Sequence, residues 1–275
     1  MGKRVLIFGV NGFAGAHLAH ELVLHGYVVC GSDLSDMCPL SEVSAYRVCD
    51  LTDNEGVAAV VREFEPDYIV NLAAVSSVGL SWRSPALTMR VNVEGALNVM
   101  EAARSQETMP RVLLVGSSEE YAAKVGPLNE GDPTLSNNPY GISKVTQEHF
   151  ATLYAERYGL HVCLTRSFNH TGPGQPPRFV LPSWCRQAAE ISRSGRPGKM
   201  VVGNLNVSRD FSDVRDVVRA YRLILEGGRA GEVYNVGSGR ALPLRDLLKT
   251  VTSFCSRPIE VEVDSALIRP TDTPS

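Results

Sequence analysis

The sequence is poor in lysine and has no surplus of basic charge. Of its 27 basic residues only 5 are lysine and 22 are arginine, and 30 acidic residues leave a formal net charge of −3. A nucleic-acid-binding surface usually needs a clear basic excess, so this balance argues against nucleic acid as the main partner. Arginine forks onto carboxylate and phosphate groups, which makes individual arginines worth following.

Long apolar runs and paired cysteines are also missing. No apolar stretch approaches the ~18 residues that a membrane-spanning helix needs, so we expect no membrane partner and a cytoplasmic location. The six cysteines form no C-x-x-C pair and none has metal-ligand spacing with histidine, which predicts no metal site. We expect most of them to be small buried residues of a protein in a reducing compartment. They are Cys30, Cys38, Cys49, Cys163, Cys185 and Cys255.

The chain has 275 residues, of which 44% are apolar, enough for one large domain or two small ones. Short β-rich apolar runs alternate with helical stretches, a pattern typical of βαβ units and a parallel, doubly wound α/β sheet. Strands that are apolar without alternation are buried on both faces. The predicted strands are Arg4–Phe8, Tyr27–Cys30, Ala45–Val48, Tyr68–Leu72, Val112–Val115 and Val162–Arg166. The predicted helices are Ala14–His25, Asn54–Phe64, Thr88–Ser105 and Tyr140–Tyr158.

The texture changes after about Ser167. A Gly/Pro-rich loop at 171–177 and a turn-rich stretch at 192–198 precede shorter elements, including predicted helices at Val214–Leu225 and Leu244–Cys255. We therefore expect a first domain over residues 1–166 and a smaller C-terminal lobe over residues 167–275.

A glycine loop follows the first strand directly and opens a helix. Gly9, Gly12 and Gly15 form G-x-x-G-x-x-G, which suits the tight turn and the close approach of backbone to a pyrophosphate at a helix N-terminus, beside Asn11 and Phe13. This context predicts a Rossmann-type dinucleotide site.

Asp33 ends the second predicted strand about 20 residues past this loop, where a carboxylate binds the ribose hydroxyls. A 2′-phosphate would be repelled there, and no Arg or Lys lies between Asp33 and Arg47. NAD(H) is therefore favoured, with NADP(H) as the alternative. Further candidates for cofactor contact, which core packing explains equally well, are Asp50, Leu51, Leu72, Ala73, Ala74 and Asn92.

Tyr140 and Lys144 form Y-x-x-x-K, and on a helix this spacing places both side chains on one face. A nearby ammonium favours the phenolate, so Tyr140 can exchange a proton with a reacting oxygen while a nicotinamide exchanges hydride. Ser117 follows a predicted strand and is placed to hydrogen-bond the same oxygen. The neighbouring acids Glu119 and Glu120 are either solvated loop residues, or one of them acts on a proton beside the reacting carbonyl.

Together these motifs resemble the extended short-chain dehydrogenase/reductases that act on nucleotide sugars. The stretches at 116–121, 168–175 and 203–211 carry a narrower resemblance to the GDP-4-keto-6-deoxy-mannose reductases, with the GDP-mannose 4,6-dehydratases as relatives. The resemblance implies a reductase that uses Ser117, Tyr140 and Lys144 to give a GDP-6-deoxyhexose of the rhamnose type. The alternatives are a dehydratase, in which Glu119 would move a proton, an epimerase, and a non-catalytic dinucleotide sensor.

The resemblance also implies site residues and a homodimer. Phe168 and His170 would lie by the nicotinamide. The residues that it implies for the nucleotide sugar are Ser76, Ser77, Val78, Ser118, Glu119, Asn169, Phe179, Val180, Asn204, Arg209 and Arg269. Three features depart from the family pattern: Asp33, Ala122 in place of a usual glycine, and a sequence that stops shortly after Arg269, so we expect an incomplete second lobe.

Overall fold

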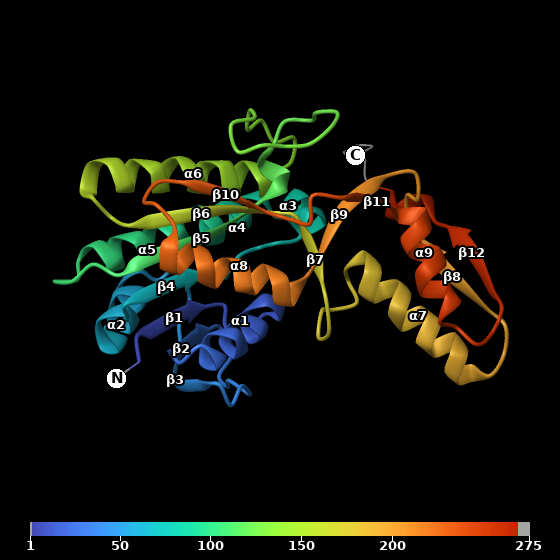
Figure 1. The fold of residues 1–275 in the computed structure, drawn as a ribbon, viewed down its shortest axis with the longest axis horizontal. Helices are drawn as coiled ribbons and strands as arrows, with labels where there is room; N and C mark the ends of the chain where they lie inside the picture. The colour runs from blue at the N-terminus through green and yellow to red at the C-terminus, as the bar shows by residue number, and fades with distance from the viewer. Residues whose placement is uncertain (1, 269–275) are drawn as a thin grey trace. The chain divides into compact units, whose positions relative to one another are not determined.

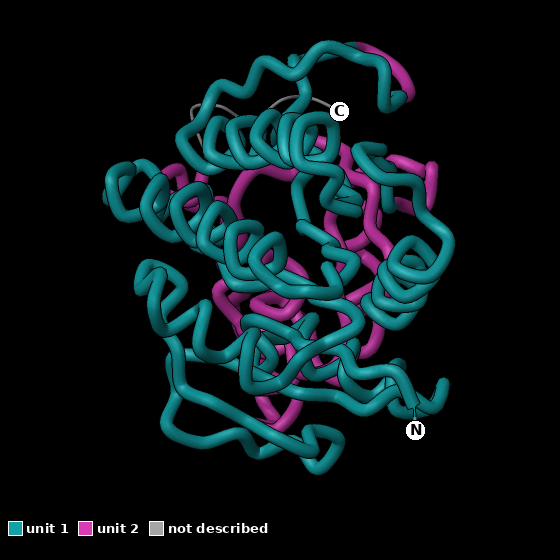
Figure 2. Tube along the Cα trace, turned by 90° about the vertical axis from the view of Figure 1, so that its left-hand side faces the viewer, with its two compact units in different colours: residues 1–124, 128–168, 214–236 teal, residues 125–127, 169–213, 237–275 magenta. Residues whose placement is uncertain are grey.

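The computed structural model describes residues 2–268, which divide into two compact units (Figure 2). The first unit contains the chain up to residue 124 together with residues 128–168 and 214–236. The second contains residues 125–127, 169–213 and the chain from 237 onward. None of the helices in residues 2–268 combines the length and the apolar composition that crossing a membrane requires.

The first unit is built on a seven-stranded sheet in the order β10-β6-β5-β4-β1-β2-β3, and all of these neighbours pair in parallel (Figure 1). Its strands are β1 (Arg4–Phe8), β2 (Val28–Asp33), β3 (Val43–Val48), β4 (Tyr68–Asn71), β5 (Arg111–Ser117), β6 (Val162–Ser167) and β10 (Val233–Val236). The order reverses at β1, as in doubly wound dinucleotide-binding sheets. The predicted Rossmann-type α/β fold is confirmed.

Two apolar cores lie on the two faces of this sheet. The helices of the first core are α2 (Asn54–Phe64), α5 (Gly95–Arg104) and α6 (Pro139–Tyr158), and those of the second are α1 (Phe13–Leu24) and α8 (Val214–Gly227). In β1, Leu6 and Phe8 enter the first core, while Val5 and Ile7 enter the second. Successive side chains of a strand point to opposite faces, which is why this strand is apolar throughout.

The helix predicted over residues 88–105 is interrupted in the structure. After α3 (Val78–Arg83), α4 (Pro85–Met89) is followed by a π-helical turn at Arg90–Glu94 and then by α5. Asn92 is buried in that turn, where its side-chain amide bonds both main-chain groups of Val75 and the Ser143 hydroxyl. The π-helical turn thus places the Asn92 side chain where it links the loop at Val75 to Ser143 of α6.

The boundary predicted between residues 166 and 167 misses a return of the chain to the first unit. Strand β10 pairs with β6 and covers an edge of the sheet that would otherwise lie open. Helix α8 buries Val214, Val217 and Tyr221 in the core that it shares with α1. These contacts are far apart in the sequence, and no local pattern marks them.

The second unit has a smaller core around Trp184 and Met200. Its helices are α7 (Val180–Ser194) and α9 (Leu244–Ser253). Its strands are β7 (Asn169–Thr171), β8 (Gly198–Val202), β9 (Ser208–Asp213), β11 (Ala241–Pro243) and β12 (Ile259–Val263). They form a three-stranded sheet in the order β11-β9-β7 and a parallel pair of β8 with β12, and a 3-10 turn follows at Ser265–Leu267.

Candidate active site

The loop between β1 and α1 carries the glycines of the predicted dinucleotide site. Gly9 has a φ of +82°, and a Cβ there would lie 2.8 Å from the main-chain nitrogen of Ala73. A Cβ on Gly15 would lie 2.4 Å from the Gly9 carbonyl oxygen, so both positions require glycine. Helix α1 begins at Phe13, with Gly12 before it, and has no side-chain cap and no acid in its first turn. Its N–H groups and dipole therefore suit a pyrophosphate, and the residues present fit a dinucleotide.

Asp33 lies at the end of β2, as predicted, and is tied to the glycine loop. Its carboxylate accepts hydrogen bonds from the main-chain N–H groups of Asn11 (3.1 Å) and Leu34 (2.8 Å). The Asn11 side chain donates to the Met37 carbonyl (2.9 Å) and to the Tyr46 hydroxyl (3.2 Å). Its own buried Oδ1 has no hydrogen-bond partner among the described residues. The loop is thus held in place with one polar atom left over.

The other cofactor candidates lie close to strand ends. Residues 72–74 follow β4, and the close approach of Ala73 to Gly9 places this segment beside the loop. Asp50 accepts hydrogen bonds from the N–H and the hydroxyl of Thr52, and Leu51 is buried against Gly95. These contacts stabilise the fold.

Ser117, Tyr140 and Lys144 all belong to the first unit. Ser117 is the last residue of β5, and Tyr140 and Lys144 lie on one face of the first turns of α6. Asn138 caps this helix, because its Oδ1 accepts the Gly141 N–H at 2.9 Å. A Cβ on Gly141 would lie 2.3 Å from the Glu119 carbonyl oxygen, so α6 packs tightly on the turn that follows Ser117. This packing brings Tyr140 within hydrogen-bonding reach of Ser117.

Both titratable groups of this trio are shifted by loss of water. Desolvation raises the pKa of the Tyr140 phenol, and the hydrogen bond with Ser117 opposes that rise. Desolvation lowers the pKa of the Lys144 ammonium to about 8, and the charge of Glu120 opposes that fall. Lys144 Nζ donates to the Val115 carbonyl at 2.7 Å and to Gln147 Oε1 at 3.1 Å. At neutral pH the geometry therefore offers a protonated phenol beside a cation.

The two acids after Ser117 have different surroundings. Glu119 is exposed, and its carboxylate accepts a hydrogen bond from Asn138 Nδ2 at 2.8 Å. Glu120 is fully buried, and its Oε1 accepts the Ser117 N–H at 2.6 Å. Ser118, between them, is partly exposed in the 3-10 turn Ser118–Glu120.

A buried ion pair lies on α6 and β6, and sequence reasoning missed it. Arg166 Nε donates to Glu148 Oε2 at 2.9 Å, Nη2 donates to Glu148 Oε1 at 2.5 Å, and both side chains are nearly inaccessible. Arg166 also lies over the Tyr121 ring, 4.7 Å from its centroid. The sequence signal was Arg166, a charged residue inside a strand that is otherwise uncharged and buried throughout.

Sequence reasoning assigned further substrate residues to both units. In the first unit, Ser77 caps α3 by accepting the Leu80 N–H at 3.3 Å, Val78 is buried and Ser76 is exposed. Phe168 is the last residue of the segment 128–168 of this unit, and its N–H donates to the Val236 carbonyl at 2.8 Å.

In the second unit, Asn169 and His170 lie on β7 and pair with Phe211 and Ser212 of β9, the strand that also carries Arg209. Phe179 and Val180 form the start of α7, and Asn204 Oδ1 accepts the Asn206 N–H at 3.0 Å. Arg269 lies outside the described residues.

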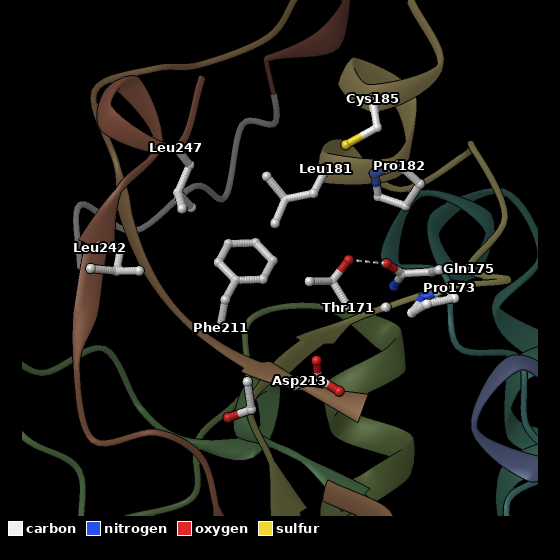
Figure 3. A pocket seen from close by; sticks show the side chains of 12 residues that line it. Thr171, Pro173, Gln175, Leu181, Pro182, Cys185, Phe211, Asp213, Leu242 and Leu247 are labelled. Carbon is white, nitrogen blue, oxygen red and sulfur yellow. Dashed lines mark hydrogen bonds between the residues drawn. The ribbon is translucent and has the colours of Figure 1, made fainter. Parts of the chain in front are cut away.

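The second unit also contains a cavity of about 660 Å³. Figure 3 shows its labelled side chains: the Phe211 ring lies between Leu181 and Leu247, with Asp213 below and Cys185 on α7. The complete lining is Thr171, Gly172, Pro173, Gln175, Leu181, Pro182, Cys185, Phe211, Ser212, Asp213, Leu242 and Leu247. None of these residues was predicted to contact the cofactor or the substrate. The cavity nevertheless lies along the strands and the helix that carry Asn169, Arg209 and Val180.

A family model of the GDP-mannose 4,6 dehydratases matches residues 6–273, nearly the whole chain. The chain belongs to this family. A GDP-6-deoxy-D-mannose reductase of Pseudomonas aeruginosa is 31% identical over 273 residues, which covers 98% of this chain and 86% of the relative.

Two solved structures are similar over nearly the whole chain. RMD from Pseudomonas aeruginosa, complexed with NADPH, is 29% identical with a TM-score of 0.83, and the match covers 99% of this chain and 88% of that one. The UDP-glucose 4-epimerase of Thermus thermophilus, in complex with NAD, is 30% identical with a TM-score of 0.85, and the match covers 98% and 88%. This family member therefore has relatives in complex with either nicotinamide cofactor.

Proposed function

We propose that this family member is a reductase that uses a nicotinamide cofactor to reduce the 4-keto group of GDP-4-keto-6-deoxy-D-mannose, giving a GDP-6-deoxyhexose of the rhamnose type. The observation that carries the proposal is the joint presence of the serine, tyrosine and lysine trio and of a relative named GDP-6-deoxy-D-mannose reductase over 98% of the chain.

The trio is arranged for proton donation to a developing alkoxide. The bound cofactor would supply the hydride that reaches carbon 4. Tyr140 is the acid, because the raised pKa of its phenol keeps it protonated at neutral pH until the oxygen beside it gains negative charge. Ser117, which reaches Tyr140, would hydrogen-bond the same oxygen.

Lys144 would act on Tyr140 and on the cofactor. Its ammonium is buried, so its charge is weakly screened and favours the phenolate that remains after proton donation. The resemblance also assigns Lys144 to the nicotinamide ribose.

A dehydratase acting on GDP-mannose is the second candidate, and Glu119 is the observation that favours it. Its carboxylate is exposed and oriented by Asn138, as a group that moves a proton to and from a sugar would need to be. A dehydratase recycles its nicotinamide internally and shows no net consumption of cofactor.

The absorbance of the reduced nicotinamide distinguishes the two. The protein is offered GDP-mannose alone, and then the keto sugar with NADH. Consumption of NADH with the keto sugar supports the reductase. Conversion of GDP-mannose without net consumption supports the dehydratase and overturns the proposal.

For the cofactor we propose NAD(H). The support is Asp33 at the end of β2, together with the state of Arg47, the first basic residue after it. Arg47 Nε donates to Glu63 at 3.0 Å, which engages the guanidinium in an ion pair. A 2′-phosphate would therefore be repelled by the Asp33 carboxylate, and the first basic residue after it in the sequence, Arg47, already pairs with Glu63. A dissociation constant for NADPH below that for NADH would overturn this assignment.

The residues proposed for the nucleotide sugar are those that the family resemblance implies. We keep the substrate assignments of Ser118, Asn169, Phe179, Asn204 and Arg209 as proposals, since a diphosphate favours bidentate guanidinium partners. Arg269 remains a proposal on the same ground. The cavity beside Phe211 offers an apolar wall to the base of the nucleotide.

We also propose a homodimer formed through α6. Ile142, Phe150 and Leu153 recur on one face of this helix and are 47%, 37% and 44% exposed. Together they make an apolar stripe that a second copy of the chain would cover.

A further inference from the structure

Glu120 is a buried carboxyl group that the proposed reaction does not use. Its side chain is 0% exposed, its Oε1 accepts the Ser117 N–H at 2.6 Å, and its Oε2 has no hydrogen-bond donor among the described residues. A Cβ on Gly116 would lie 2.4 Å from Glu120 Oε1, so the glycine is what admits the carboxyl group. A carboxylate with an unsatisfied oxygen at this depth is costly, and a protonated acid is not.

The Lys144 ammonium lies along the same side of β5 as this acid. Lys144 Nζ binds the carbonyl of Val115, and Glu120 binds the N–H of Ser117, two residues further along the strand. Main-chain groups two residues apart point to the same side of a strand, so the two side chains are neighbours. The other acceptor of Lys144 is the neutral amide of Gln147. Glu120 is thus the carboxyl group that can become an anion beside the buried ammonium.

The remaining charged groups around Glu120 are already committed. On α6, Glu148 accepts two hydrogen bonds from Arg166 of β6 in a bidentate ion pair. Its negative charge opposes ionisation of Glu120, whose pKa is raised, burial being the larger cause. Tyr140, also on α6, is a neutral phenol, and Glu119 of the same turn accepts from Asn138. Glu120 therefore interacts with the charge of Glu148 and with the charge of Lys144, which act on it in opposite directions.

Building on the proposed function, we propose that Glu120 is a positioning residue that keeps Lys144 in its ammonium form by ionising beside it. As the pH rises, the O–H bond of Glu120 breaks, the proton goes to water and the electron pair stays on the carboxylate. The new anion then faces Lys144 and stabilises its positive charge. Without Glu120, Lys144 would have only neutral acceptors and would lose its proton at a lower pH.

The test compares NADH binding by the wild type, Glu120→Gln and Glu156→Gln from about pH 6 to about pH 10, read by nicotinamide fluorescence. Glutamine keeps an acceptor for the Ser117 N–H but cannot ionise. Glu156 is an exposed acid on the same helix, so its variant controls for loss of charge. We expect Glu120→Gln to lose NADH affinity tenfold at a pH about one unit or more below the wild type, whereas Glu156→Gln follows the wild type.

A uniform loss of affinity at every pH in Glu120→Gln would mean a merely structural role, and unchanged curves would mean none; both results overturn the proposal. Glu120→Asp retains a carboxyl group and is expected to restore most of the binding at high pH. Urea unfolding of the same proteins without any ligand reports on Glu120 separately. If no nucleotide sugar is turned over, the proposed function fails, while the binding and unfolding comparisons still decide the role of Glu120.

Discussion

Glu120→Gln changes how the stability of the protein depends on pH. Burial and the charge of Glu148 raise the pKa of Glu120 from 4.5 to about 8 in the folded chain. Between these values the unfolded chain has lost this proton and the folded chain retains it. Folding then takes up a proton, so stability is lost as the pH rises. The glutamine variant has no such proton and should not show this loss.

The magnitude follows from the difference between folded and unfolded chains. One pKa unit corresponds to ~1.4 kcal/mol, so a rise from 4.5 to about 8 amounts to about 5 kcal/mol across the whole window. This is comparable to the total stability of many domains, ~5–15 kcal/mol. Relative to Glu120→Gln, the wild type should lose ~1.4 kcal/mol of unfolding free energy for each pH unit between about 5 and 8.

The assay is urea unfolding followed by circular dichroism, with Glu156→Gln as the control. The comparison stays below about pH 8, because the lowered pKa of Lys144 makes a contribution of opposite sign above it. A constant difference between the wild type and Glu120→Gln across this window would show that Glu120 is already ionised in the folded chain. That result would contradict the raised pKa of Glu120.

Four further changes have defined outcomes. Tyr140→Phe should lower turnover by orders of magnitude while leaving the NADH dissociation constant within about twofold, and near-normal turnover would exclude Tyr140 as the acid. Asp33→Ser should weaken NADH binding about tenfold and reduce the difference between the dissociation constants for NADH and NADPH, as measured by fluorescence titration. Gly9→Ala should cost ~1–3 kcal/mol in unfolding free energy and abolish cofactor binding, because of its φ of +82° and the nearby Ala73 nitrogen. Phe150→Asp should convert the proposed dimer to a monomer in light scattering; a wild type that is already monomeric would refute the interface.

Much of the fold could be predicted because it is local. The strand β1 matches its predicted bounds. Its four consecutive apolar residues place alternate side chains in the two cores, and such an uninterrupted apolar run is typical of a strand that is buried on both faces. The return of 214–236 could not be predicted in the same way. A helix was predicted at Val214–Leu225, but the helix α8 packs on α1, some 200 residues earlier, and the short strand β10 belongs to the sheet only through its pairing with β6.

The site divides along the same line. The secondary-structure elements of Gly9, Asp33, Tyr140 and Lys144 were predicted correctly, because these residues stand in motifs with a fixed sequence spacing. The burial of Glu120 could not be predicted. In sequence alone, Glu119 and Glu120 can each be solvated or buried. Glu120 is buried because its carboxyl group binds the Ser117 N–H and because Gly116 has no side chain that would collide with this carboxyl group.

The buried pair of Arg166 with Glu148 makes sense only with this acid in view. Removing two charges from water costs about as much as their attraction returns, so such a pair is a poor source of stability. Its effect on the site is specific, however. Arg166 holds the Glu148 carboxylate in a bidentate pair, burial and the charge of Glu148 raise the pKa of Glu120, and Glu120 thus keeps a proton that it can release beside Lys144 as the pH rises. If this is why the pair is there, Glu148→Gln should ionise Glu120 at a lower pH and flatten the stability loss of the wild type. In a Glu120→Gln background, Glu148→Gln should still lower the unfolding free energy, because it leaves Arg166 unpaired, but it should no longer change the pH dependence of stability.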